Sequence, residues 1–197
     1  RVCMELGINT AQLSTLDAKE AIKAGENVVG GKAWGLALLA DAKATVPTWR
    51  VVPATACRAA IKRGGLEDDF LAQLTEMAGL NPQDASDRAR LDAGAQSMRQ
   101  RVESLSVESL LQGSVADWFG DGDQGPFAVR SSMVGEDSEK HSFAGQLDSF
   151  LFQSAEDVPG AIARCWGSAF SSHALLYRLQ AGLVDVPAVA VVVQIML

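Results

Sequence analysis

An arginine and two serines stand directly after a short apolar run in the second half of the chain. The run, residues 127–129, has the composition of a buried strand. It is followed at once by Arg130, Ser131 and Ser132. A guanidinium and two hydroxyls delivered at the end of a strand can converge on a ligand, so we expect a binding site at this point.

The segment that follows is polar and then becomes apolar again. Residues 133–141 are rich in charge and contain Gly135, which is typical of a loop. A run of small residues, 142–146, leads into the apolar stretch 147–152, whose alternation indicates a return strand. The pattern predicts two strands joined by a polar loop, and its glycines and charges lead us to expect that this loop is mobile.

A second candidate site lies near the start of the chain. Residues 28–29 predict a short strand, a Gly-Gly-Lys sequence ends at Lys32, and residues 33–40 have helical spacing. Glycine lets backbone amides approach an anion, a helix start presents free N–H groups, and lysine adds a positive charge. These residues alone leave two interpretations open: a phosphate site, or an ordinary helix start with a solvated lysine.

This glycine-lysine segment is not a Walker phosphate loop. That motif requires the pattern G-x-x-x-x-G-K-[ST]. Gly25 lies one residue too far away, and Ala33 stands where a hydroxyl would hold Mg²⁺. Any phosphate contact made by Lys32 must therefore follow a different pattern.

Taken together, the two segments resemble the nucleotide-binding domain of the pyruvate phosphate dikinase and phosphoenolpyruvate synthase family, which includes rifampicin phosphotransferases and glucan water dikinases. The family pattern is close to V-G-G-K, then A-V-R-S-S-A-x-x-E-D, then S-F-A-G-Q. Residues 29–32, 128–132, 136–137 and 142–146 reproduce these parts in the same order. The match is specific because a dozen residues agree with the family pattern between positions 128 and 146.

The resemblance implies roles for particular side chains. Lys32 and Arg130 would hold the phosphates of ATP, and the loop of residues 142–146 would close over them. The last strand, residues 187–197, resembles the family's V-x-V-Q-x-M, which leads into the hinge between two lobes and borders the adenine. The residues expected to bind the nucleotide are Lys32, Arg130, Ser131, Gly145, Gln146, Gln194 and Met196.

The resemblance also implies the fold class. Residues 1–197 are expected to form one domain, the N-terminal lobe of an ATP-grasp-like domain, which is α+β with a mixed, mostly antiparallel sheet and packed helices. The expected helices are residues 11–16, 18–24, 33–40, 55–62, 67–77, 85–103 and 160–179, and the further strands are 46–53 and 187–197. Asp17 is the expected N-cap of the helix 18–24.

Two other motifs resemble functional sites but lack the context that such sites require. Ser172-His173-Ala174 is similar to the T-S-H-A-like motif of a phosphate-carrying histidine, but here it falls inside an amphipathic helix, so we interpret His173 as structural. Asp121 and Asp123 suggest a calcium loop, but no ligand series of the required spacing follows them. We assign no metal ligand in this chain and expect the phosphohistidine elsewhere.

Composition limits the class of protein. The 197 residues are 48% apolar, and 17 basic against 24 acidic residues give a net charge of −7 with no basic block, which argues against nucleic-acid binding. Cys3, Cys57 and Cys165 are far apart and form no CxxC motif, as expected for reduced thiols. Such thiols lead us to expect a cytoplasmic protein, and no signal peptide or apolar run long enough to span a membrane is visible.

The resemblance implies the ATP-binding part of a dikinase-like phosphotransferase. ATP with Mg²⁺, whose ligands are expected in a second lobe, would pass phosphate to a histidine on a swivelling domain of the same polypeptide. The final acceptor, which could be pyruvate, water with phosphate, a glucan or an antibiotic, belongs to other domains. The chain lacks an initiator Met and stops inside a strand-like run, so we expect a piece of a longer protein that is inactive alone. Three alternatives stay open: a regulatory nucleotide-binding module, a rifampicin-phosphotransferase-like enzyme, and a structural lobe.

Overall fold

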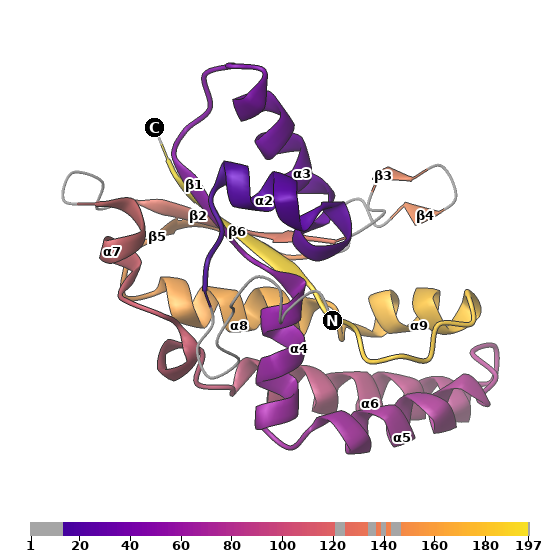
Figure 1. The fold of residues 1–197 in the computed structure, drawn as a ribbon. Coiled ribbons are helices and arrows are strands. Elements are labelled where there is room, and N and C mark those ends of the chain that lie inside the picture. Colours follow the sequence, from indigo (N-terminus) through magenta and orange to yellow (C-terminus); the bar gives the residue numbers. More distant parts are fainter. Residues whose placement is uncertain (1–13, 121–124, 134–136, 139–140, 143–146, 197) are drawn as a thin grey trace.

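A four-stranded antiparallel sheet organises the described part of the chain (Figure 1). The computed structural model describes residues 14–120, 125–133, 137–138, 141–142 and 147–196. The strands are β1 (Trp49–Val52), β2 (Phe127–Ser132), β5 (Ser149–Gln153) and β6 (Ala190–Ile195), in the spatial order β1-β6-β2-β5. This arrangement confirms the expected α+β class with an antiparallel sheet.

The last strand in sequence, β6, lies at the centre of the sheet. It pairs with β1, where Trp49 lies opposite Gln194, and with β2, where Arg130 lies opposite Val192. Its residues from Ala190 to Val193 are fully buried, because both of its faces are covered by helices. This explains why the strand is a continuous apolar run in the sequence.

Helices form a layer on each face of the sheet (Figure 1). On one face lie α2 (Ala18–Ala24) and α3 (Glu26–Asp41), which bury a small apolar cluster that includes Val192. On the other face a larger cluster contains Phe127 and Val129 of β2. Its helices are α4 (Ala54–Arg63), α5 (Glu67–Ala78), α6 (Ala85–Glu103), α8 (Val158–Ser168) and α9 (Ser172–Gln180). The remaining elements are η1 (Glu108–Leu110), α7 (Val115–Phe119) and the short pair β3 (Asp137–Ser138) and β4 (His141–Ser142).

Helices with strong local signals form where the sequence predicts them. The helix α2 begins with a capping box, in which the Asp17 carboxylate accepts from the Glu20 backbone N–H at 2.9 Å and the Glu20 carboxylate accepts from the Asp17 N–H at 2.8 Å. The prediction of α6 over residues 85–103 is confirmed to the residue. The predictions of α4 and α5 are confirmed within a residue or two.

Three predicted elements differ from the structure. Residues 14–16 are not helical, since Leu16 forms an antiparallel bridge to Val51. Residues 28–29 lie in α3 rather than in a strand. The single helix predicted over 160–179 is two helices, because residues 169–171 are not helical. The Ser171 hydroxyl caps α9 by accepting from the Ala174 N–H at 3.3 Å.

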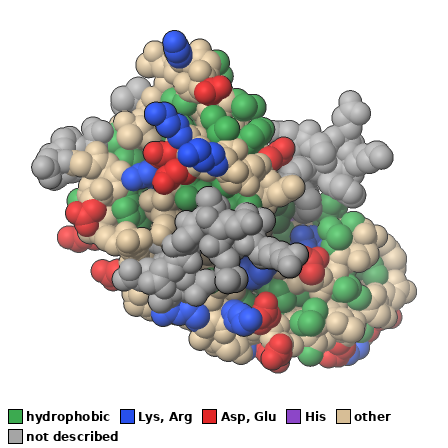
Figure 2. Space-filling model, in the orientation of Figure 1, with side chains coloured by type: hydrophobic (Ala, Val, Ile, Leu, Met, Phe, Trp, Pro, Cys, Tyr) green, Lys and Arg blue, Asp and Glu red, His purple; other side chains and the backbone are tan. Residues whose placement is uncertain are grey.

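The surface carries mixed charge. On the face drawn in Figure 2, basic and acidic side chains are interspersed. Arg50 of β1 and Glu20 of α2 form an ion pair, with 3.8 Å between their charged atoms. Among the described residues, no helix has the length and apolar character needed to cross a bilayer.

Candidate functional site

The helix α3 is interrupted at Gly30, directly before the predicted phosphate-binding lysine. Gly30 has φ 77° and ψ 165°, a backbone conformation that glycine adopts and other residues avoid. The second part of α3 therefore begins at Gly31, and Lys32 lies in its first turn. The sequence prediction of a helix start at Gly-Gly-Lys is confirmed, although a helix and not a strand leads into it.

The start of this second helical part is bonded to the end of β2. The Gly31 N–H donates to the Met133 carbonyl at 2.9 Å, and the Ala33 N–H donates to the Ser132 hydroxyl at 3.1 Å. The two sequence motifs, about a hundred residues apart, are thus in direct contact. Because β2 already occupies these two amides, they are not free for a phosphate, and Lys32 between them is the cationic group that the helix start contributes.

Arg130 and Ser131 point to opposite faces of the sheet. Side chains alternate along a strand, and Ser132 bonds to α3, so Arg130 shares the α3 face while Ser131 shares the opposite face with Val129. Arg130 is half-buried, whereas Ser131 is fully buried. The Ser131 hydroxyl donates to the Asp148 carbonyl at 3.1 Å. The structure therefore separates two residues that the sequence grouped in one site.

Gln194 and Met196 lie near the other end of β2. Gln194 lies opposite Ala128, and by alternation from Val192 it shares the α3 face with Arg130. Met196 follows the end of β6, where its N–H donates to the Pro126 carbonyl at 2.9 Å. Both side chains are half-buried and so retain access to solvent.

The strand β5 exposes apolar side chains next to Met196. The Met196 sulfur accepts from the Phe152 N–H at 3.2 Å. Leu151 is 51% exposed and Phe152 is 72% exposed. Phe152 also has φ 55° at a point where the β2–β5 register shifts, so the strand is bulged there. The sheet face over β2 and β5 thus has a cationic end beside α3 and an apolar end beside Met196.

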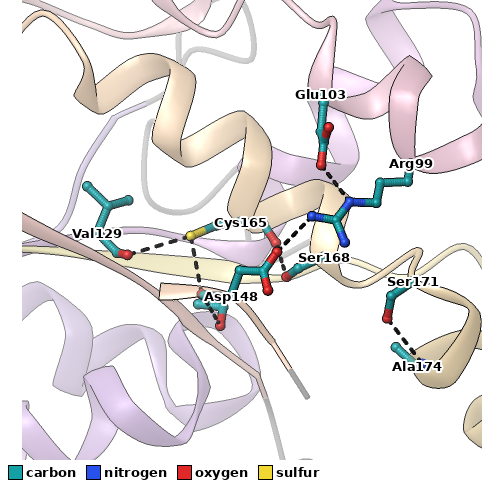
Figure 3. Close-up of polar contacts among 9 residues, drawn as sticks. Arg99, Glu103, Val129, Asp148, Cys165, Ser168, Ser171 and Ala174 are labelled. Atoms are coloured by element: carbon teal, nitrogen blue, oxygen red, sulfur yellow. Dashed lines mark hydrogen bonds and ion pairs between the residues drawn. The ribbon is translucent and has the colours of Figure 1, made fainter. Parts of the chain in front are cut away.

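A polar network that includes Arg99, Glu103, Asp148 and Cys165 lies on the opposite face of the sheet (Figure 3). Arg99 of α6 bonds to the Glu103 carboxylate at 2.7 Å and to the Asp148 carboxylate at 2.8 Å. The backbone carbonyl of Asp148 also lies 3.7 Å from the Cys165 sulfur. Burial, reinforced by the negative charge of Asp148, raises the pKa of the Cys165 thiol to about 12, so this thiol is neutral near pH 7.

Two of the predicted nucleotide-binding residues, Gly145 and Gln146, fall outside the described residues. In the part of the chain that the structure describes, no group of three His, Cys, Asp or Glu side chains is placed to hold a metal ion. His173 lies exposed in the first turn of α9.

Sequence reasoning missed two features of this region. Ser132 was noted as a hydroxyl at the strand end, but its bond to Ala33 joins residues 99 positions apart and leaves no local signal. The i,i+4 spacing of Arg99 to Glu103 is typical of an ordinary surface ion pair, so the sequence carries no signal for the contact of Arg99 with Asp148.

Comparison with known proteins gives a consistent set of similarities. Residues 26–197 match the family described as pyruvate phosphate dikinase, AMP/ATP-binding domain. The chain is 33% identical over 175 residues to a probable phosphoenolpyruvate synthase of Archaeoglobus fulgidus, covering 85% of this chain and 22% of that protein. It is 33% identical over 190 residues to a rifampicin phosphotransferase of Streptomyces sviceus, covering 94% and 21%. The chain thus spans about a fifth of the length of these relatives.

Proposed function

The chain belongs to the family of the pyruvate phosphate dikinase AMP/ATP-binding domain, and from this premise we propose that it is the ATP-binding part of a dikinase-like phosphotransferase. The observation that carries the proposal is the placement of Arg130 and Gln194 on one sheet face. Lys32 is held beside the end of β2 by the backbone bonds of its neighbours Gly31 and Ala33. The charge and the apolar surface of this face suit the two ends of a nucleoside triphosphate.

ATP would lie along β2. Its phosphates would face Lys32 and Arg130, since a guanidinium offers paired donors to phosphate oxygens and an ammonium offers a compact charge. Its adenine would lie at the other end, near Gln194 and Met196, where exposed Leu151 adds apolar surface. A base with an apolar face and polar edges fits such a mixture of amide and aliphatic groups.

The other predicted nucleotide residues have different support. Ser131 is bonded to Asp148 on the covered face, so we propose that it holds the strand that carries Arg130 rather than touching phosphate. Gly145 and Gln146 are proposed to close over the phosphates on the strength of the sequence resemblance alone.

The complete enzyme would need parts beyond this chain's own site. Mg²⁺ would neutralise charge between the phosphates, with ligands from a second lobe. We propose that phosphate then passes to a histidine on a swivelling domain of the same cytoplasmic polypeptide. Relatives named phosphoenolpyruvate synthase and rifampicin phosphotransferase are equally similar at 33% identity, so the acceptor is not assigned.

Calorimetric titration of ATP with Mg²⁺ into the complete polypeptide tests the proposal. Lys32→Ala and Arg130→Ala are each expected to weaken binding about ten-fold or more, roughly 1.4 kcal/mol. Lys62→Ala is the matched control, because Lys62 is an exposed lysine on α4, in the opposite helix layer. Absence of ATP binding by the unmodified protein would refute the proposal and favour a structural lobe. ATP binding without phosphoryl transfer would favour the regulatory module.

A further inference from the structure

The ion pair between Arg99 and Asp148 joins α6 to the start of β5. The Arg99 guanidinium is held from two sides, by Glu103 of its own helix at 2.7 Å and by Asp148 at 2.8 Å (Figure 3). Glu103 is itself packed closely, since a Cβ on Gly167 of α8 would lie 2.5 Å from its Cγ. Arg99 therefore meets Asp148 in a defined orientation, with its guanidinium shared between two carboxylates.

Asp148 in turn is bonded to β2 through its backbone. Its carbonyl accepts from the Ser131 hydroxyl at 3.1 Å and from the Ser131 N–H at 3.4 Å. The residue pair next to this contact is Arg130 opposite Ser149. The Arg99 ion pair thus ends one residue away from Arg130, on the other side of the sheet.

The charges around Arg99 favour the ion pair. Burial lowers the pKa of Arg99, but the hydrogen bonds and charges of Glu103 and Asp148 outweigh burial, so the net change is upward. The Arg99 and Asp148 side chains are 35% and 41% exposed, so solvent screens the pair only in part. A partly shielded pair held in fixed geometry constrains position better than a solvated one.

We propose that Arg99 is a positioning residue for ATP binding: through Asp148 and Ser131 it fixes the segment of β2 that presents Arg130 to the triphosphate. The inference rests on the proposed function. The inference adds Arg99 to the residues that affect ATP binding, although its helix, α6, lies on the face of the sheet opposite the proposed ligand. Arg99 acts through Arg130 and makes no contact with the nucleotide.

The test compares nucleotide affinities across variants of the complete polypeptide. Arg99→Ala is expected to weaken ATP binding about five-fold, the scale of a partly exposed ion pair, and to leave adenosine binding unchanged. Asp148→Asn, which removes the charge but keeps the carbonyl that binds Ser131, should give the same pattern, and Arg99→Lys should restore part of the affinity. Arg88→Ala is the matched control, because Arg88 pairs with Asp92 within the same helix.

A double-mutant cycle separates positioning from general stability. In an Arg130→Ala background, Arg99→Ala should cause no further loss of ATP affinity, since both changes act on the same contact, that of Arg130 with the triphosphate. Additive losses, or equal losses for ATP and adenosine, would overturn the inference. If the unmodified protein binds ATP and Arg99→Ala binds it with the same affinity, this inference alone is overturned. If the unmodified protein binds no ATP, the proposed function is overturned as well.

Discussion

Gly30 packs directly against the main chain of Ser132. A Cβ at position 30 would lie 2.2 Å from the Ser132 carbonyl oxygen and 2.5 Å from its hydroxyl oxygen. The contact brings the second part of α3, which carries Lys32 in its first turn, against the strand that carries Arg130. The relative placement of these two cations therefore depends on the absence of a side chain at one position.

Replacing Gly30 with alanine should destabilise the protein severely. Two penalties combine, a positive φ of 77° and a backbone clash, and we expect a loss of about 3 kcal/mol or more in the free energy of unfolding. Gly35→Ala is the control, because Gly35 lies in the same helix with no atom within 4 Å of an added Cβ. The control should gain up to about 1 kcal/mol. Urea denaturation measures both, and equal effects would contradict the packing described here.

Removing the Ser132 hydroxyl should affect both stability and ATP binding. Ser132→Ala leaves the buried Ala33 N–H without its acceptor, which should cost about 1–2 kcal/mol of stability. Because Lys32 precedes Ala33, ATP affinity should fall as well. Ser171→Ala removes a comparable cap from α9 and should lower stability only. Chemical denaturation and calorimetry together distinguish the outcomes, and a Ser132→Ala protein with unchanged ATP affinity would separate this cap from the site.

Phe152 is held in a backbone conformation that suits asparagine better. Its φ of 55° is left-handed, which costs a bulky residue about 1–2 kcal/mol, and its ring is 72% exposed and so gains little from burial. Phe152→Asn should therefore raise the midpoint of thermal unfolding. Leu151→Asn, at the neighbouring exposed position of the same bulge, where φ is not positive, should lower it slightly. A lower midpoint for Phe152→Asn would mean that the exposed ring contributes to stability.

The two described cysteines should make stability fall at high pH. Burial raises the pKa of Cys57 and of Cys165 from 9.0 to about 12. In the unfolded chain these thiols ionise near their ordinary pKa, whereas the folded protein keeps them protonated. The stabilisation is complete below about pH 9 and is lost toward pH 12, by up to about 1.4 kcal/mol per pH unit for each thiol.

Cysteine variants check this prediction by urea denaturation at several pH values. Cys57→Ala and Cys165→Ala should each give a shallower decline of stability above about pH 9 than the unmodified protein. Both thiols are free and buried, so disulfide reduction does not complicate the comparison. An unchanged slope in either variant would show that the thiol ionises at its ordinary pKa in the folded protein.

The local signals in the sequence predicted most of the fold. Periodicity placed α2 and α6 correctly, and the predicted N-cap Asp17 is found at the start of α2, because helical spacing and a capping residue are specified by neighbouring residues. The apolar runs at β2 and β6 likewise predicted strands. Errors occurred where a distant contact overrides local preference, as at Leu16, which pairs with Val51.

The order of motifs along the chain indicates the candidate binding residues and the family to which they point. Which of these residues lie together depends on the folded arrangement. It placed Arg130 and Gln194 on one face of the sheet, turned Ser131 to the other, and connected Arg99 to Asp148. The physical reason is that alternation along a strand is a local property, whereas the face that meets each helix layer depends on packing between segments far apart in the chain.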